Sequence, residues 1–205
     1  IDQIRTLYLS ASRYLLLVIA PLLVPAILLV PDLLLLWLGR EAEQAAAVPT
    51  QILLAAYFVT VFSIIPCQVY NGIGETRLAL AYAAVGTVSN VALCWLLIPG
   101  LGLVGAAIAG FVGMLPSIML MAAVERLLGF PWLRVQTSLY LRLLLVLLLQ
   151  AVFVLAVRHY VTGWWSLLLT GSAAWMLCYL IWFAGPLATD EDRNLARQLL
   201  TARRV

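Results

Sequence analysis

The sequence predicts an all-α membrane protein, a polytopic bundle of about six transmembrane helices. Hydrophobic residues make up 65% of its 205 residues and charged residues only 10%, whereas soluble domains are typically about 45–50% apolar and about 25% charged. The apolar residues fall into long runs, and the arginines gather near the ends of those runs. Lipid must therefore be the solvent for much of this chain.

The predicted spans are the runs that reach the roughly 20 apolar residues a helix needs to cross a bilayer. Each run is expected to be helical, because backbone groups in lipid must be hydrogen-bonded within their own segment. The runs cover about 12–37, 46–71, 78–98, 103–124, 139–158 and 164–185. We therefore predict one transmembrane bundle over residues 1–188.

The arginines predict the orientation, because cytoplasmic loops of membrane proteins are enriched in basic residues. Every arginine except Arg40 and Arg158 falls on the side that holds the N-terminus, and the chain has no lysine. That side is predicted to be cytoplasmic. Both termini then lie inside, and the number of spans is even.

The first span carries prolines that are expected to bend it. Pro21 and Pro25 lie four residues apart on one face, and each removes a backbone hydrogen bond. The bend is either static or a hinge of a moving transporter, so these two prolines are hinge candidates. After Pro31 we expect a short re-angled helix with Asp32 as its first-turn acid.

The last stretch, residues 189–205, predicts a short amphipathic helix on the cytoplasmic face. Thr189 is a suitable helix cap, and acidic residues follow it directly. Leu195, Leu199 and Leu200 form a narrow apolar stripe beside several arginines. This pattern is typical of a helix that lies at the membrane surface near anionic headgroups.

The sequence holds no recognisable catalytic or metal site, so we expect no enzyme and no cofactor. His159 is the only histidine and lies at an outer helix end. The three cysteines are isolated within apolar runs, and no pair of acids occurs inside a span. A nucleic-acid interface would need a clustered basic face, and these arginines are spread along the chain.

Polar side chains at membrane depth are the candidates for a substrate path, because they tend to face a bundle interior or a water-filled cavity. The uncharged ones are Gln51, Gln68, Asn71, Asn90 and Gln150. Gln68 and Asn71 lie one turn apart near Arg77, whose forked guanidinium suits phosphate. Asn90 is the deepest of the path candidates, which are Gln68, Asn71, Arg77 and Asn90. An interhelical hydrogen bond is the alternative role for the uncharged ones.

We expect the fold to be organised around the stretch from Asn71 to Gly113. Its second half carries small residues at a spacing of four, at Gly105, Ala109 and Gly113. Such a ridge lets two helices approach closely. It predicts packing and says nothing of a substrate.

The same stretch carries a family resemblance. A glycine-rich turn leads from Gly72 to Arg77, an apolar span has Asn90 near its middle, and a second turn follows with the residues Ile98, Pro99, Gly102, Gly105, Ala106, Ala107 and Ala109. Over roughly residues 10–128 the chain resembles the polysaccharide (O-antigen type) flippases of the multidrug/oligosaccharidyl-lipid/polysaccharide exporter superfamily. Cys94 stands where that family often has a second asparagine, and Glu75 where it often has a basic or polar residue.

The resemblance implies the C-terminal lobe of a larger transporter in the bacterial cytoplasmic (inner) membrane. Such a transporter flips lipid-linked oligosaccharide or polysaccharide precursors, used for lipopolysaccharide O-antigen among others, by alternating access. Its implied partners are an undecaprenyl-diphosphate-linked sugar, membrane lipid and an N-terminal lobe that precedes Ile1. The alternatives are a drug or peptidoglycan-precursor exporter of the same superfamily, or a non-transporting membrane assembly subunit.

Overall fold

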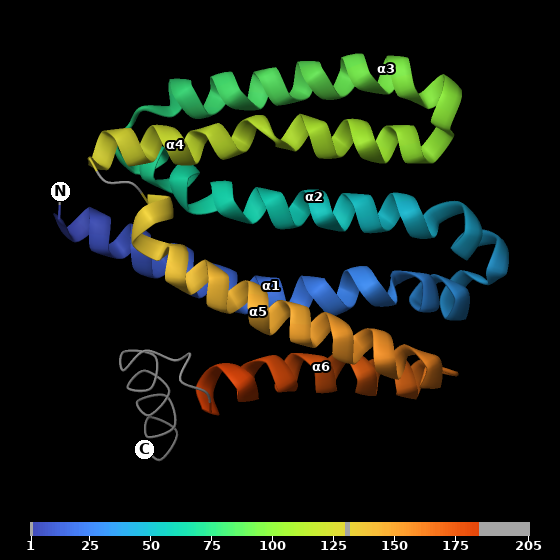
Figure 1. Cartoon of the computed structure of the whole chain (residues 1–205). Coiled ribbons are helices and arrows are strands. Elements are labelled where there is room, and N and C mark those ends of the chain that lie inside the picture. The colour runs from blue at the N-terminus through green and yellow to red at the C-terminus, as the bar shows by residue number, and fades with distance from the viewer. Residues whose placement is uncertain (1, 130–131, 185–205) are drawn as a thin grey trace, which may run out of the picture.

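The computed structural model describes residues 2–129 and 132–184, and these are helical apart from short connections (Figure 1). The elements are α1 (Asp2–Leu38), α2 (Arg40–Gly72), α3 (Thr76–Met114), α4 (Pro116–Leu128), α5 (Trp132–Val157), the 3₁₀ turn η1 (Arg158–Tyr160) and α6 (Trp164–Ala184). The all-α prediction is confirmed for this part of the chain. The tail helix predicted over 189–205 lies outside the described residues.

Five segments are long and apolar enough to cross a membrane. They are Leu7–Leu38, Arg40–Gly72, Thr76–Val124, Leu141–Tyr160 and Trp164–Trp182. No more than 33% of the most apolar window of any of them is buried inside the protein. Their apolar side chains therefore face outward, which is stable only in lipid. The chain is a multi-pass membrane protein.

Helix α3 is a hairpin of two arms. The backbone of Gly102 has φ 57° and ψ −131°, which breaks the helix at a conformation that favours glycine. The chain reverses there, as Figure 1 shows, so an outgoing arm (76–101) lies against a returning arm (103–114). The spans predicted over 78–98 and 103–124 correspond to the outgoing arm and to the returning arm together with α4.

Small residues let the two arms of α3 touch through their backbones. A Cβ atom on Gly86 would collide with the carbonyl oxygen of Gly113, and one on Gly105 would lie 2.5 Å from the carbonyl oxygen of Leu97. Gly110 faces another way, toward Leu53 of α2. The close approach expected from the small-residue ridge is confirmed, and its main partner is the outgoing arm of the same helix.

The helices form an extended stack in which each packs on its neighbours (Figure 1). Helix α2 lies between α1 on one side and the α3 hairpin with α4 on the other, while α5 and α6 pack against α1. Helix α1 begins and α6 ends at the same end of the stack. The α1–α2 connection at the opposite end is the single residue Gly39, at φ 87°.

The apolar core centres on α1, which contributes to three buried clusters. The first joins Leu16 and Ala20 to residues of α2, α5 and α6. The second joins Tyr8 to α2 and α4, and the third joins Leu29 to α5 and α6. The expectation that 71–113 organises the fold is wrong, because the outgoing arm of α3 is mostly exposed and α1 is the helix that contributes to all three clusters.

Several predicted boundaries differ from the structure. Helix α1 begins at Asp2 rather than near residue 12, and α5 begins at Trp132 rather than near 139. The length of an apolar run predicts the segment of a helix that lies in lipid. The hydrogen-bonded helix itself continues beyond that segment. No separate helix follows Pro31, because α1 continues to Leu38. Asp32 is an ion-pair partner of Arg158, with 2.7 Å between Oδ2 and Nε.

Candidate functional site

Three of the four path candidates gather where α2 ends and α3 begins. Gln68 and Asn71 are exposed on the last turns of α2, and Arg77 is exposed in the first turn of α3. Asn71 makes a weak local contact, with its Nδ2 3.8 Å from the Sγ of Cys67. The polar heads of these residues are therefore available at one end of the stack.

The turn between α2 and α3 keeps these residues together. The backbone N–H of Ile73 bonds to the carbonyl of Val69 at 3.1 Å and so closes α2. Gly74 then takes φ 80°, a backbone conformation that favours glycine. The N–H of Glu75 returns to the carbonyl of Tyr70 at 3.1 Å. The chain thus reverses within a few residues and places the start of α3 beside the end of α2.

Asn90 lies apart from the other three candidates. It is half-buried between the arms of α3, where a Cβ atom on Gly113 would lie 2.8 Å from its own Cβ. The Sγ of Cys94 lies 3.2 Å from its Oδ1 and donates to it. Asn90 follows Arg77 by thirteen helical residues, about 20 Å along the axis. A single phosphate group at Arg77 would not reach it.

A hollow of about 360 Å³ lies beside the polar end of α2. Gln68 contributes the polar side chain, and Gly72 leaves room at the rim. The remaining wall comes from the start of α1 and the last turns of α2, with Ile4, Leu7, Tyr8, Ala11, Ile65, Val69 and Ile73. The hollow is amphipathic, with an amide at one edge and apolar side chains elsewhere.

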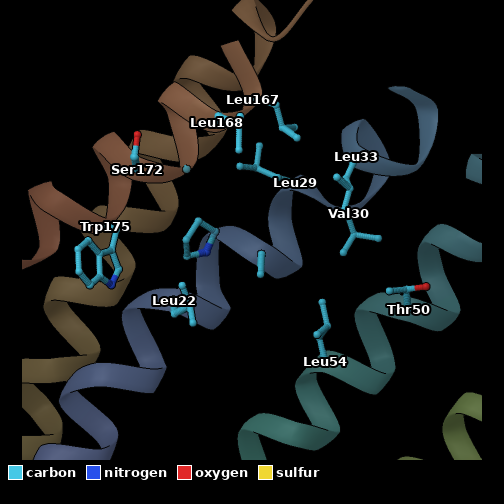
Figure 2. Close-up of a pocket in the computed structure, with 13 residues that line it drawn as sticks. Leu22, Leu29, Val30, Leu33, Thr50, Leu54, Leu167, Leu168, Ser172 and Trp175 are labelled. Carbon is cyan, nitrogen blue, oxygen red and sulfur yellow. The ribbon is translucent and has the colours of Figure 1, made fainter. Parts of the chain in front are cut away.

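A larger groove of about 600 Å³ lies between α1, α2 and α6 (Figure 2). Thr50 of α2 and Ser172 of α6 line it on opposite sides, and the other lining residues are apolar. Pro25 and Gly171 belong to its wall. Sequence reasoning missed this groove, because its residues come from three helices that are distant in the chain and none of them is unusual for a membrane span.

The hinge candidates Pro21 and Pro25 lie inside α1 and are both buried. No break in the helix accompanies them, since α1 is continuous from Asp2 to Leu38. Pro25 also borders the large groove, so a bending motion of α1 at this residue would move one wall of that groove.

Metal-binding groups are not assembled in the described part of the chain. Within residues 2–129 and 132–184, no three His, Cys, Asp or Glu side chains come close enough to hold a metal ion. Cys67, Cys94 and Cys178 are free thiols. The candidate site therefore consists of polar and cationic side chains that can bind a ligand by hydrogen bonds and charge.

Comparison with known proteins adds no relative. The chain matches no protein-family model, no curated protein and no solved structure.

Proposed function

We propose that this chain is one lobe of a membrane transporter that flips lipid-linked oligosaccharide or polysaccharide precursors across the bacterial cytoplasmic membrane by alternating access. The observation that carries the proposal is the exposed group of Gln68, Asn71 and Arg77 at one end of a largely apolar multi-pass bundle. Arginine and amide groups suit the diphosphate and sugar of such a headgroup. The resemblance of roughly residues 10–128 to polysaccharide flippases supports the same class of cargo.

The proposed topology is six crossings with both ends in the cytoplasm. The segment Thr76–Val124 has 49 residues and would be about 74 Å long as a straight helix, whereas the hydrocarbon core is about 30 Å thick. Its reversal at Gly102 divides it into two lengths that each suit one crossing. The end that holds Arg77 is then the cytoplasmic one, because most arginines belong to that end.

The two hollows support an amphipathic cargo. The smaller one, at the end that we place in the cytoplasm, has an amide at its edge. The larger one runs along apolar side chains of α1, α2 and α6. A lipid-linked sugar has a polar head and a long apolar tail, so its two parts need surfaces of these two kinds. Pro21 and Pro25 remain the hinge candidates for the motion between inward-open and outward-open states.

Transport by the complete protein, including the N-terminal lobe that we propose, tests this assignment. The triple variant Gln68→Ala, Asn71→Ala, Arg77→Ala should flip a fluorescent lipid-linked sugar in proteoliposomes at least about tenfold more slowly. Losing one charge-assisted contact costs about 1.5–3 kcal/mol, and about 1.4 kcal/mol is tenfold. Gln44→Ala is the matched control, since Gln44 is an exposed glutamine at the other end of α2.

Other outcomes point to the alternatives. Normal flipping by the triple variant would exclude these residues from the path. Export of hydrophobic drugs or of a peptidoglycan precursor, without flipping of the sugar lipid, would favour another exporter of the same superfamily. No transport of any of these cargoes by the complete wild-type protein would favour a membrane assembly subunit.

A further inference from the structure

A proline inside a helix leaves one carbonyl group without its helical donor. The N–H of residue i normally bonds to the carbonyl four residues earlier, and proline has no N–H. In α1, Pro21, Pro25 and Pro31 therefore release the carbonyls of Leu17, Pro21 and Ile27. A bare carbonyl in lipid or in a protein core is costly, so each needs another donor.

Each of these three carbonyls receives a hydrogen bond from a side chain. The Oη of Tyr179 donates to Leu17 O at 3.1 Å. The Nε2 of Gln150 donates to Pro21 O at 2.8 Å, and the Nε2 of Gln51 donates to Ile27 O at 2.9 Å. The three acceptors are the ones that the three prolines release.

The donors come from three different helices. Tyr179 belongs to α6, Gln150 to α5 and Gln51 to α2. Gln150 also donates to Ala174 O of α6 at 3.1 Å, so one amide ties three helices together. Each of these helices packs against α1. The bonds therefore hold α1 from several directions.

At Gln150 the hydrogen-bond donor of the amide, and not its acceptor, is the group that contacts α1. Its side chain is fully buried, and its Oε1 has no hydrogen-bond partner among the described residues. A buried acceptor without a partner is unfavourable. The position is compatible with glutamine because its N–H groups have two acceptors, one of them the carbonyl released by Pro25.

We infer that Tyr179, Gln150 and Gln51 form a proline clamp, in which each side chain replaces the backbone donor that one proline of α1 lacks. The clamp holds α1 in one shape and fixes where α2, α5 and α6 attach to it. Any hinge motion at Pro21 or Pro25 has to release Tyr179 or Gln150. This inference is independent of the proposed cargo, because it concerns the stability of the bundle.

The clamp predicts that each donor matters only while its proline is present. Pro25→Ala restores an N–H that can bond to Pro21 O within the helix. Gln150→Met, close in shape but without a donor, should lower the melting temperature of the full chain in detergent by about 2–4 °C. In the Pro25→Ala background the same change should lower it by less than half as much.

Two further double-mutant cycles repeat the test at Gln51 and Tyr179, which are half-buried. The clamp can therefore be tested even if Gln150 variants do not fold. Gln51→Met is paired with Pro31→Ala, and Tyr179→Phe with Pro21→Ala. Gln44→Met and Tyr57→Phe are matched controls on exposed positions of α2 and should shift the melting temperature by less than 1 °C. Equal losses in the proline and alanine backgrounds, in the cycles whose variants fold, would overturn the clamp and leave these residues as ordinary packing contacts.

Discussion

Asn90 shows how a polar residue deep in a span can be satisfied locally. Its Oδ1 accepts from the Sγ of Cys94 one turn later, and its Cβ packs near Gly113 of the returning arm. The sequence left a path residue and an interhelical hydrogen bond as alternatives. The hydrogen bond from Cys94 lies within one helix, so the contact to the other arm is made by packing, which is effective because glycine has no side chain there.

The ion pair between Arg158 and Asp32 should contribute little to stability. The side chain of Arg158 is 37% exposed and that of Asp32 is 17% exposed, so solvent partly screens the two charges. Arg158→Gln and Asp32→Asn should each lower the free energy of unfolding by no more than about 1 kcal/mol. A double-mutant cycle from denaturant unfolding in detergent checks this. A coupling energy well above about 1 kcal/mol would contradict this screening and mean that the pair is shielded from water.

The α3 hairpin depends on backbone contact between its arms. Gly86→Ala should destabilise the protein by about 1–3 kcal/mol, because the new Cβ collides with the carbonyl of Gly113. This loss should appear although alanine favours a helix over glycine by about 1 kcal/mol. Gly100→Ala is the matched control, since a Cβ there meets nothing within 4 Å.

Thermal unfolding of both glycine variants in the same detergent measures the difference. A melting temperature of Gly86→Ala equal to or above that of Gly100→Ala would contradict the hairpin packing. The sequence predicted a close approach from the small-residue spacing alone. It could not predict that the returning arm packs against the outgoing arm of the same helix. The spacing of small residues shows which face of a helix is narrow, but not which helix packs on that face.

The topology of the whole molecule predicts which residues share a side of the membrane. Gln44 and Thr162 lie at the end of the stack opposite Glu75, and all three are exposed. In a variant with alanine at Cys67, Cys94 and Cys178, a membrane-impermeant maleimide should label Gln44→Cys and Thr162→Cys from outside intact cells. Glu75→Cys should react only in inverted vesicles.

These labelling patterns distinguish six crossings from other counts. Opposite labelling of Gln44→Cys and Thr162→Cys would mean an odd number of crossings between them and would contradict a hairpin of two full arms in α3. Labelling of all three variants from outside would contradict the proposed cytoplasmic position of Arg77. The arginine bias predicted this sidedness, because basic residues are retained in the cytoplasm during insertion.

The sequence by itself determined the class of the protein. Long apolar runs require lipid, and helices are the means by which a single span satisfies its own backbone in lipid. The sequence also placed Gln68, Asn71 and Arg77 close together, because local spacing and a glycine turn keep neighbours near each other. Both properties depend on residues that are close to one another in the sequence, so they can be predicted without knowing how the helices pack.

Only the tertiary structure decided which helix is central and what the polar residues contact. Gln51, Gln150 and Tyr179 lie 24, 129 and 162 residues from the carbonyls they reach. Since nearly every helix face here is apolar, hydropathy could not select which faces meet. The three hydrogen bonds to α1 join faces that hydropathy does not distinguish. Three carbonyl groups of α1 lack a helical donor, and α2, α5 and α6, which pack against α1, each supply one.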